Sequence, residues 1–162
     1  MIHSIADLPV ILEAFKQALH ADDASSNTTS AYLSDIGHFI TWYIENFQTF
    51  TISEVTPIDI REYREHLQAQ TPPTTPATIN RRLAALRRFF NWANENHLNE
   101  FQPTERIRNV EIMSHGPKSL DRKQWHRLQR SVEQAKGIQG IRDRSILLML
   151  YHTGLRAGDY VG

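Results

Sequence analysis

The chain has 162 residues, enough for about one to one-and-a-half ordinary domains, and it contains no cysteine. The lack of cysteine excludes a disulfide framework, a thiolate nucleophile and zinc sites built on sulfur ligands. The apolar runs are short, the longest being Ile146–Tyr151, whereas a membrane span needs roughly 20 residues. A hydrophobic content of 40% with 22% charged residues is typical of a globular chain, and we expect a soluble, cytoplasmic protein.

The formal net charge is zero, but the two halves of the chain differ strongly in charge. Residues 1–74 contain three Lys or Arg and ten Asp or Glu, whereas residues 75–162 contain fifteen and eight. A basic segment of this kind indicates a nucleic acid or an acidic partner. A solvated basic face balanced by the acidic half explains the same asymmetry, and charge alone does not separate the two interpretations.

Apolar residues recur at helical spacing along most of the chain, which predicts an all-α fold. The first helix follows Asp7 and ends in the polar stretch 20–26, and the second begins near residues 26–29 and runs to about Phe47. Thr56-Pro57 followed by Asp59 predicts the start of a third helix, because it combines a hydroxyl cap, a proline at the first helical position and an acid in the first turn.

The fourth helix is the most informative segment. Three prolines in residues 71–76 interrupt the chain, and Thr75-Pro76 then predicts a helix that runs to about Glu95. Its core-facing stripe consists of Ile79, Leu83, Leu86, Phe90 and Ala93. Arg81 and Arg88 lie on the opposite side among Ala77, Ala84 and Ala85, and Arg82 and Arg87 flank the stripe. We therefore expect Arg81 and Arg88 to be exposed and dispensable for folding.

The remainder of the chain predicts a second domain. Ser114-His-Gly-Pro117 indicates a linker, which gives a first domain over residues 1–110, a linker over 111–119 and a second domain over 120–162. A helix with Trp125, Leu128 and Val132 on one face is expected after Asp121, followed by a loop over 137–140. The last helix, near residues 142–152, is apolar nearly all round, which predicts that it is buried and ends at Thr153-Gly154.

Arginines on an alanine-lined helix suit an approach to DNA, because small side chains let the helix come close while the guanidinium groups reach phosphates or guanine edges. Thr75 and Thr78 add hydroxyl groups at the start of the same helix. The polar start of the second helix, which includes Asn27 and Thr28, suits a phosphate. Ordinary helix capping and a solvated basic face remain open as explanations at this point.

Other chemistries find little support in the sequence. The eight histidines include no pair spaced by four residues on a helix, and the seven glycines form no phosphate-binding loop. We therefore expect no metal, no cofactor and no small-molecule substrate. Arg156 follows an apolar helix and a glycine turn, a position in which a fixed charge stabilises a phosphoryl transition state. An ordinary arginine in a loop fits the same spacing.

Residues 142–156, with Arg142-Asp143 and Thr153-Gly-Leu-Arg156, resemble the segment around the first catalytic arginine of the tyrosine recombinases, the phage-integrase family. Residues 78–92 resemble the fourth helix of that family's core-binding domain, and Ser26-Asn-Thr28, Tyr32, Asp35 and Phe39 resemble its second helix. The resemblance implies a SAM-like orthogonal bundle of four to five helices, with the second and fourth helices at the major groove. The linker then leads to the first helices of a catalytic domain on the other face of the DNA.

The resemblance also implies roles for individual residues. Arg156 contacts the scissile phosphate, Asp159 supports it, and a tyrosine forms a 3′-phosphotyrosyl bond without a metal or cofactor. The partners implied are double-stranded DNA and other recombinase protomers. The residues expected to bind DNA are Asn27, Thr28, Thr75, Thr78, Arg81, Arg82, Arg87, Arg88 and Lys118.

The family's remaining catalytic residues, including the nucleophilic tyrosine, come after its first arginine, and this sequence has six residues after Arg156. Tyr160 lies too close to Arg156 to be that nucleophile. We therefore expect the DNA-binding portion of a site-specific tyrosine recombinase, truncated before the nucleophile and inactive alone. The alternatives are a helical protein-interaction module and a transcriptional regulator without recombinase activity.

Overall fold

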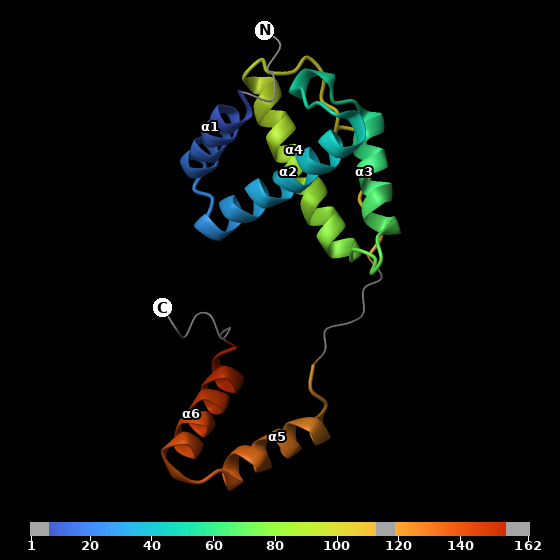
Figure 1. Cartoon of the computed structure of the whole chain (residues 1–162). Helices are drawn as coiled ribbons and strands as arrows, with labels where there is room; N and C mark the ends of the chain where they lie inside the picture. The colour runs from blue at the N-terminus through green and yellow to red at the C-terminus, as the bar shows by residue number, and fades with distance from the viewer. Residues whose placement is uncertain (1–6, 113–118, 155–162) are drawn as a thin grey trace. The chain divides into compact units, whose positions relative to one another are not determined.

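The computed structural model describes residues 7–112 and 119–154 (Figure 1). All regular structure in these residues is helical, which confirms the predicted all-α class. The chain divides into two compact units, Met1–Met113 and Ser114–Gly162. No helix within the described ranges has the length and apolar character needed to cross a membrane.

Over residues 8–112, the first unit is a bundle of four α-helices with a short 3-10 helix between the second and the third. Its elements are α1 (Leu8–Ala21), α2 (Ser26–Phe47), η2 (Ile52–Glu54), α3 (Pro57–Ala69) and α4 (Pro76–Glu95). Figure 1 shows α2 crossing α4, with α1 on one side of the crossing and α3 on the other. This is the predicted helical bundle, and its centre is the contact between α2 and α4.

Side-chain caps explain why three of these helices begin where they do. Thr56 and Asp59 form a capping box at the start of α3, in which each side chain bonds the backbone N–H of the other residue. At α4 the Thr75 hydroxyl accepts from the Thr78 backbone N–H, and at α2 the Ser25 hydroxyl accepts from that of Thr28. The predicted starts at Thr56-Pro57 and Thr75-Pro76 are confirmed.

The core of the first unit is aromatic and centres on Phe39 of α2. Its ring centroid lies 5.2 Å from that of Tyr63 in α3 and 6.2 Å from that of Phe90 in α4, so one side chain joins three helices. The predicted core stripe of α4 is buried in full. Phe89 and Ala85 are also buried, so Ala85 belongs to the core and not, as predicted, to the surface beside the arginines.

The second unit contains α5 (Arg122–Gln134) and α6 (Gly137–Thr153). Trp125 of α5 stacks on Tyr151 of α6 with ring centroids 4.1 Å apart, and the Arg144 guanidinium donates to the Glu133 carbonyl oxygen over 3.0 Å. These contacts hold the two helices against each other, and the capping box of Asp121 and Gln124 starts α5.

Two predictions about α6 are wrong. Residues 137–140 form its first turn, not a loop. The helix was expected to be buried, but Gly140 is its only buried residue among those described, and the Leu148 and Tyr151 side chains are exposed. The physical reason is that each helix of a packed pair covers only one face of the other, so an all-round apolar helix keeps the rest of its surface uncovered.

Two helical glycines give a matched test of this packing. A Cβ on Gly140 would overlap the backbone carbonyl of Ala135, whereas a Cβ on Gly37 of α2 meets nothing within 4 Å. We expect Gly37→Ala to raise the free energy of unfolding by up to about 1 kcal/mol, since alanine is the better helix former. Gly140→Ala should instead lower the thermal stability of the second unit. Circular dichroism and hydrogen exchange measure this change. An unchanged Gly140→Ala variant would contradict the close approach at this turn.

Candidate nucleic-acid interface

The four arginines of α4, Arg81, Arg82, Arg87 and Arg88, form the centre of the predicted interface, and we call them the α4 arginines. All four hydrogen-bond or ion-pair within the first unit. Arg81 and Arg88 were expected to be exposed and dispensable for folding, and the sequence did not predict their ion pairs with Asp35 and Asp22. Their side chains are nevertheless 48% and 38% exposed, so both guanidinium groups still reach the surface.

Asp35 of α2 is the partner of Arg81. Its side chain is 1% exposed, and its Oδ2 lies 2.6 Å from Arg81 Nη1, while its Oδ1 lies 3.7 Å from Arg82 Nε. Burial raises the pKa of the Asp35 carboxyl, and the charges of Arg81 and Arg82 partly offset that rise. A buried carboxylate without these partners would be costly, so Arg81 contributes to the fold as well as to the surface.

Arg82 is the least accessible of the set, with a side chain 16% exposed. It lines a cleft of about 150 Å³ between α2, α3 and α4, together with Tyr63. Burial raises the pKa of Tyr63 to about 12, above the ordinary tyrosine value. The position of Arg82 beside the core agrees with the prediction that it flanks the buried stripe.

Arg87 and Arg88 are held by segments distant in the sequence. The Arg87 Nη2 donates to the Ile107 carbonyl oxygen over 2.7 Å and to Asn109 Oδ1 over 2.9 Å. Arg88 forms an ion pair with Asp22, the residue that follows α1. Asp22 and Asn109 were not predicted, and no local pattern could have found them, because 66 and 22 positions separate them from their arginines.

The predicted polar residues lie at the starts of α2 and α4. Asn27, Thr28 and Thr75 are exposed, and Thr78 is half-buried. The Thr75 and Thr78 hydroxyls lie 2.9 Å apart, as do those of Ser25 and Thr28. Capping therefore engages these hydroxyls, and each helix presents its N-terminal turn with the positive end of the helix dipole.

Three predicted site residues, Lys118, Arg156 and Asp159, lie outside the described residues. The helix that leads toward Arg156 ends as expected: Gly154 takes a left-handed conformation with φ of 66°, and its N–H donates to the Leu150 carbonyl oxygen over 3.0 Å. In residues 7–112 and 119–154, no group of three or more metal-binding side chains comes together.

Comparison with known proteins links this geometry to one family. The family model described as "Phage integrase, N-terminal SAM-like domain" matches residues 12–97, the segment that contains α2, α3 and α4. The tyrosine recombinase XerD of Shewanella oneidensis is 31% identical over 154 residues, which cover 94% of this chain and 49% of that protein. A tyrosine recombinase of Pseudothermotoga lettingae is 30% identical over 150 residues, covering 92% and 50%. The chain thus spans about half the length of these relatives.

The Arg81–Asp35 contact predicts a pH-dependent stability effect. Arg81→Ala should destabilise the first unit by about 1.5–3 kcal/mol near pH 7, because a hydrogen-bonded charge is lost beside a buried carboxylate. The attraction exists only while Asp35 is ionised, so the loss should shrink as the pH falls through the raised pKa of Asp35. Urea denaturation of both proteins at pH 7 and at a pH below the raised pKa of Asp35 measures how the loss of unfolding free energy changes with pH.

The Asp35→Asn background is the control for that experiment. Without the carboxylate, Arg81→Ala should have a smaller effect on the free energy of unfolding, and the effect should be nearly independent of pH. An equal, pH-independent loss in both backgrounds would show that Arg81 contributes packing alone.

Proposed function

Because the chain belongs to the tyrosine recombinase, or phage-integrase, family, we propose that its first unit is a duplex-DNA-binding domain that places α2 and α4 at the major groove. The match of the family model to residues 12–97 carries this proposal. The matched segment holds the α4 arginines and the capped starts of both helices. The proposed role is to position a recombinase on its DNA site.

The two helix starts supply sequence-independent phosphate contacts. The N-terminal turn of a helix carries the positive end of the dipole, which favours a phosphate. The caps occupy the N–H groups of Thr28 and Thr78, so the dipole and the side chains carry most of this contribution. Thr75 and Thr78 at α4, and Asn27 and Thr28 at α2, provide further polar groups beside these turns. Such contacts fix the position of the protein on the duplex without reading its sequence.

The α4 arginines keep a net positive charge after their internal ion pairs are counted. Four guanidinium groups face two carboxylates, Asp35 and Asp22, which leaves an excess of two positive charges. Arg87 bonds only neutral acceptors in the described residues, so its charge is not cancelled. The Arg88–Asp22 pair is exposed on both sides, and exposed pairs of this kind contribute little, about 0–1 kcal/mol. A phosphate can therefore replace Asp22 at Arg88 with little loss.

We further propose that the second unit opens the catalytic domain of a site-specific recombinase. On this proposal Arg156 contacts the scissile phosphate and neutralises charge that develops on its oxygens, and Asp159 supports that arginine. Lys118 contacts the DNA from the linker. The partners are double-stranded DNA and further recombinase protomers, and the proposed chemistry uses no metal or cofactor.

Arg88 and Asp22 provide a test with opposite outcomes. In the full chain, Arg88→Ala should weaken duplex binding and reduce the slope of log affinity against log salt by about 1, because one phosphate contact is lost. Asp22→Asn should strengthen binding, because the Arg88 guanidinium no longer has a competing carboxylate. Fluorescence anisotropy with a labelled duplex at several salt concentrations measures both effects.

Arg61→Ala is the matched control, since Arg61 is an exposed base on α3, outside the proposed interface. It should leave the salt slope unchanged. Duplex binding that is absent or independent of salt in the unaltered chain would overturn the proposal. Self-association that disappears in salt, without DNA retention, would instead favour a helical protein-interaction module.

A further inference from the structure

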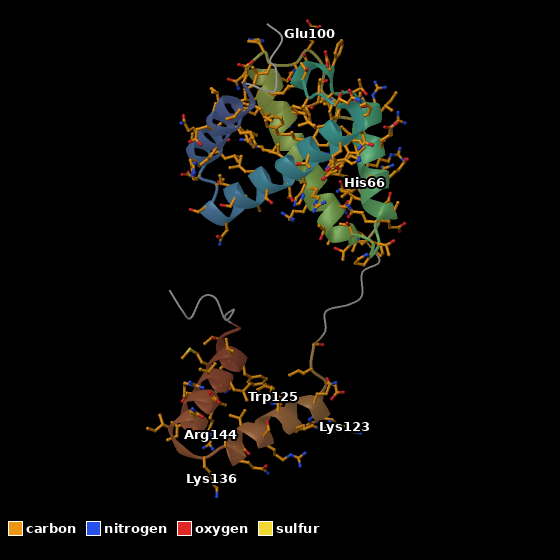
Figure 2. All side chains as sticks on the ribbon, in the orientation of Figure 1. His66, Glu100, Lys123, Trp125, Lys136 and Arg144 are labelled. Atoms are coloured by element: carbon orange, nitrogen blue, oxygen red, sulfur yellow. The ribbon has the colours of Figure 1, made fainter. Side chains whose placement is uncertain are left out.

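Helix α5 separates apolar from basic side chains. Its apolar residues Trp125, Leu128 and Val132 lie on one side, and Trp125 lies toward α6 (Figure 2). At 100° per residue, the opposite side collects four basic side chains within an arc of about 100°. These residues are Lys123, His126, Arg127 and Arg130, and we call them the α5 basic face.

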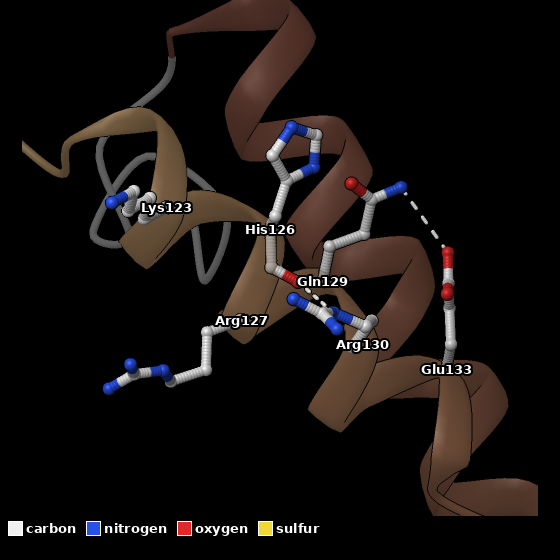
Figure 3. A pocket seen from close by; sticks show the side chains of 6 residues that line it. All are labelled: Lys123, His126, Arg127, Gln129, Arg130 and Glu133. Atoms are coloured by element: carbon white, nitrogen blue, oxygen red, sulfur yellow. Dashed lines mark hydrogen bonds between the residues drawn. The ribbon is translucent and has the colours of Figure 1, made fainter.

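The α5 basic face lacks the internal acids that the α4 arginines have. Within residues 7–112 and 119–154, Lys123 and Arg127 form no ion pair, and Figure 3 shows Arg127 extending away from the helix. Arg130 donates to a neutral acceptor, the His126 carbonyl oxygen, over 3.3 Å. Glu133, the only acid of α5, accepts from the Gln129 amide over 3.2 Å. Glu133 also lines the groove beside this face, so one carboxylate offsets part of the charge of Lys123, Arg127 and Arg130, and an excess of positive charge remains.

This arrangement does not stabilise α5. Lys123 and Arg127 are like charges spaced by four residues, a pairing that disfavours a helix. Lys123 also lies in the first turn, where the dipole favours acids over bases. The apolar side alone accounts for the packing against α6. An anionic partner outside the described residues would give this concentration of charge a role that helix stability does not.

The surroundings of the α5 basic face distinguish a polyanion from a protein partner. An open groove of about 620 Å³ runs along it and is lined only by polar or charged side chains (Figure 3). Protein interfaces are centred on aromatic and aliphatic anchors, and this groove has none. The protein side of an interface with DNA is more polar and much more positively charged than a protein–protein interface.

We propose that the α5 basic face binds phosphates of the DNA backbone and forms a second, sequence-independent contact surface in addition to α4. This inference rests on the proposed function. From Lys123 to Arg130 the helix rises by about 10 Å, which matches about three phosphates of one strand at 3.4 Å of axial rise each. Backbone contacts of this type set affinity and position and leave sequence reading to other residues.

The test removes three charges from the full chain in the variant Lys123→Gln/Arg127→Gln/Arg130→Gln. Two to three lost phosphate contacts should reduce the slope of log affinity against log salt by about 2–3. Between 50 and 200 mM salt, the unaltered chain should therefore lose roughly 10- to 40-fold more affinity for a duplex than the variant loses. The reduction in this slope should be the same for duplexes of unrelated sequence.

Arg142→Gln is the matched control, because Arg142 lies in the same unit, is 64% exposed and is already paired with Asp143. The Arg142→Gln variant should have the same slope of log affinity against log salt as the unaltered chain. Circular dichroism of the triple variant should show unchanged helix content, since glutamine is a good helix former and like-charge repulsion is removed. The single variant Arg127→Gln, with an expected slope change of about 1, keeps the test valid if the triple variant unfolds.

The outcomes separate the two proposals. If the unaltered chain fails to bind duplex DNA, the proposed function fails. If the chain binds with a slope that depends on Arg88 but not on the α5 basic face, this inference alone is overturned. Loss of self-association in the triple variant with unchanged DNA binding would assign the face to a second copy of the chain and would also overturn it.

Discussion

The ion pair between Asp35 and Arg81 fixes how α2 crosses α4, and the rest of the first unit depends on that crossing. Asp35 is a carboxylate on the buried side of α2 with its Oδ2 2.6 Å from Arg81 Nη1. Turning α4 so that Arg81 faces away would leave the buried carboxylate with only its longer contact to Arg82, and a buried charge that loses its main partner costs several kcal/mol. A contact of this kind favours one rotation of α4 against α2, even where its net contribution to stability is modest.

The aromatic core and the charged pair reinforce each other because they share a helix face. Phe39 follows Asp35 by one helical turn, so the residue that joins α2 to Tyr63 and Phe90 lies next to the residue that bonds Arg81. Packing around Phe39 holds the helices at a fixed distance, and the ion pair fixes their rotation. The exposed part of Arg81 and the Thr75 cap are therefore presented from a rigid base.

Local sequence determines much of this structure. The hydroxyl-proline pairs at Thr56 and Thr75 begin helices because the caps and the prolines act within four residues of each other. The core face of α4 follows from periodicity alone. The partners of Arg87 and Arg88 could not be predicted, since residues 107–109 and Asp22 approach α4 only once the bundle has folded. Periodicity also failed for α6, because it reports an apolar helix but not what covers it.

The two units use positive charge in different ways. In α4, Asp35 and Asp22 hold Arg81 and Arg88 in place and cancel part of their charge. Lys123, Arg127 and Arg130 of the α5 basic face form no ion pair within the described residues. Salt screens exposed charges over about 8 Å at physiological ionic strength, and it screens partly buried pairs much less. Arg81, paired with a buried carboxylate, therefore contributes mainly a defined position, which suits contacts that depend on geometry. The α5 basic face, whose bases form no ion pair within the described residues, contributes mainly a salt-sensitive field, which suits contacts that only require negative charge.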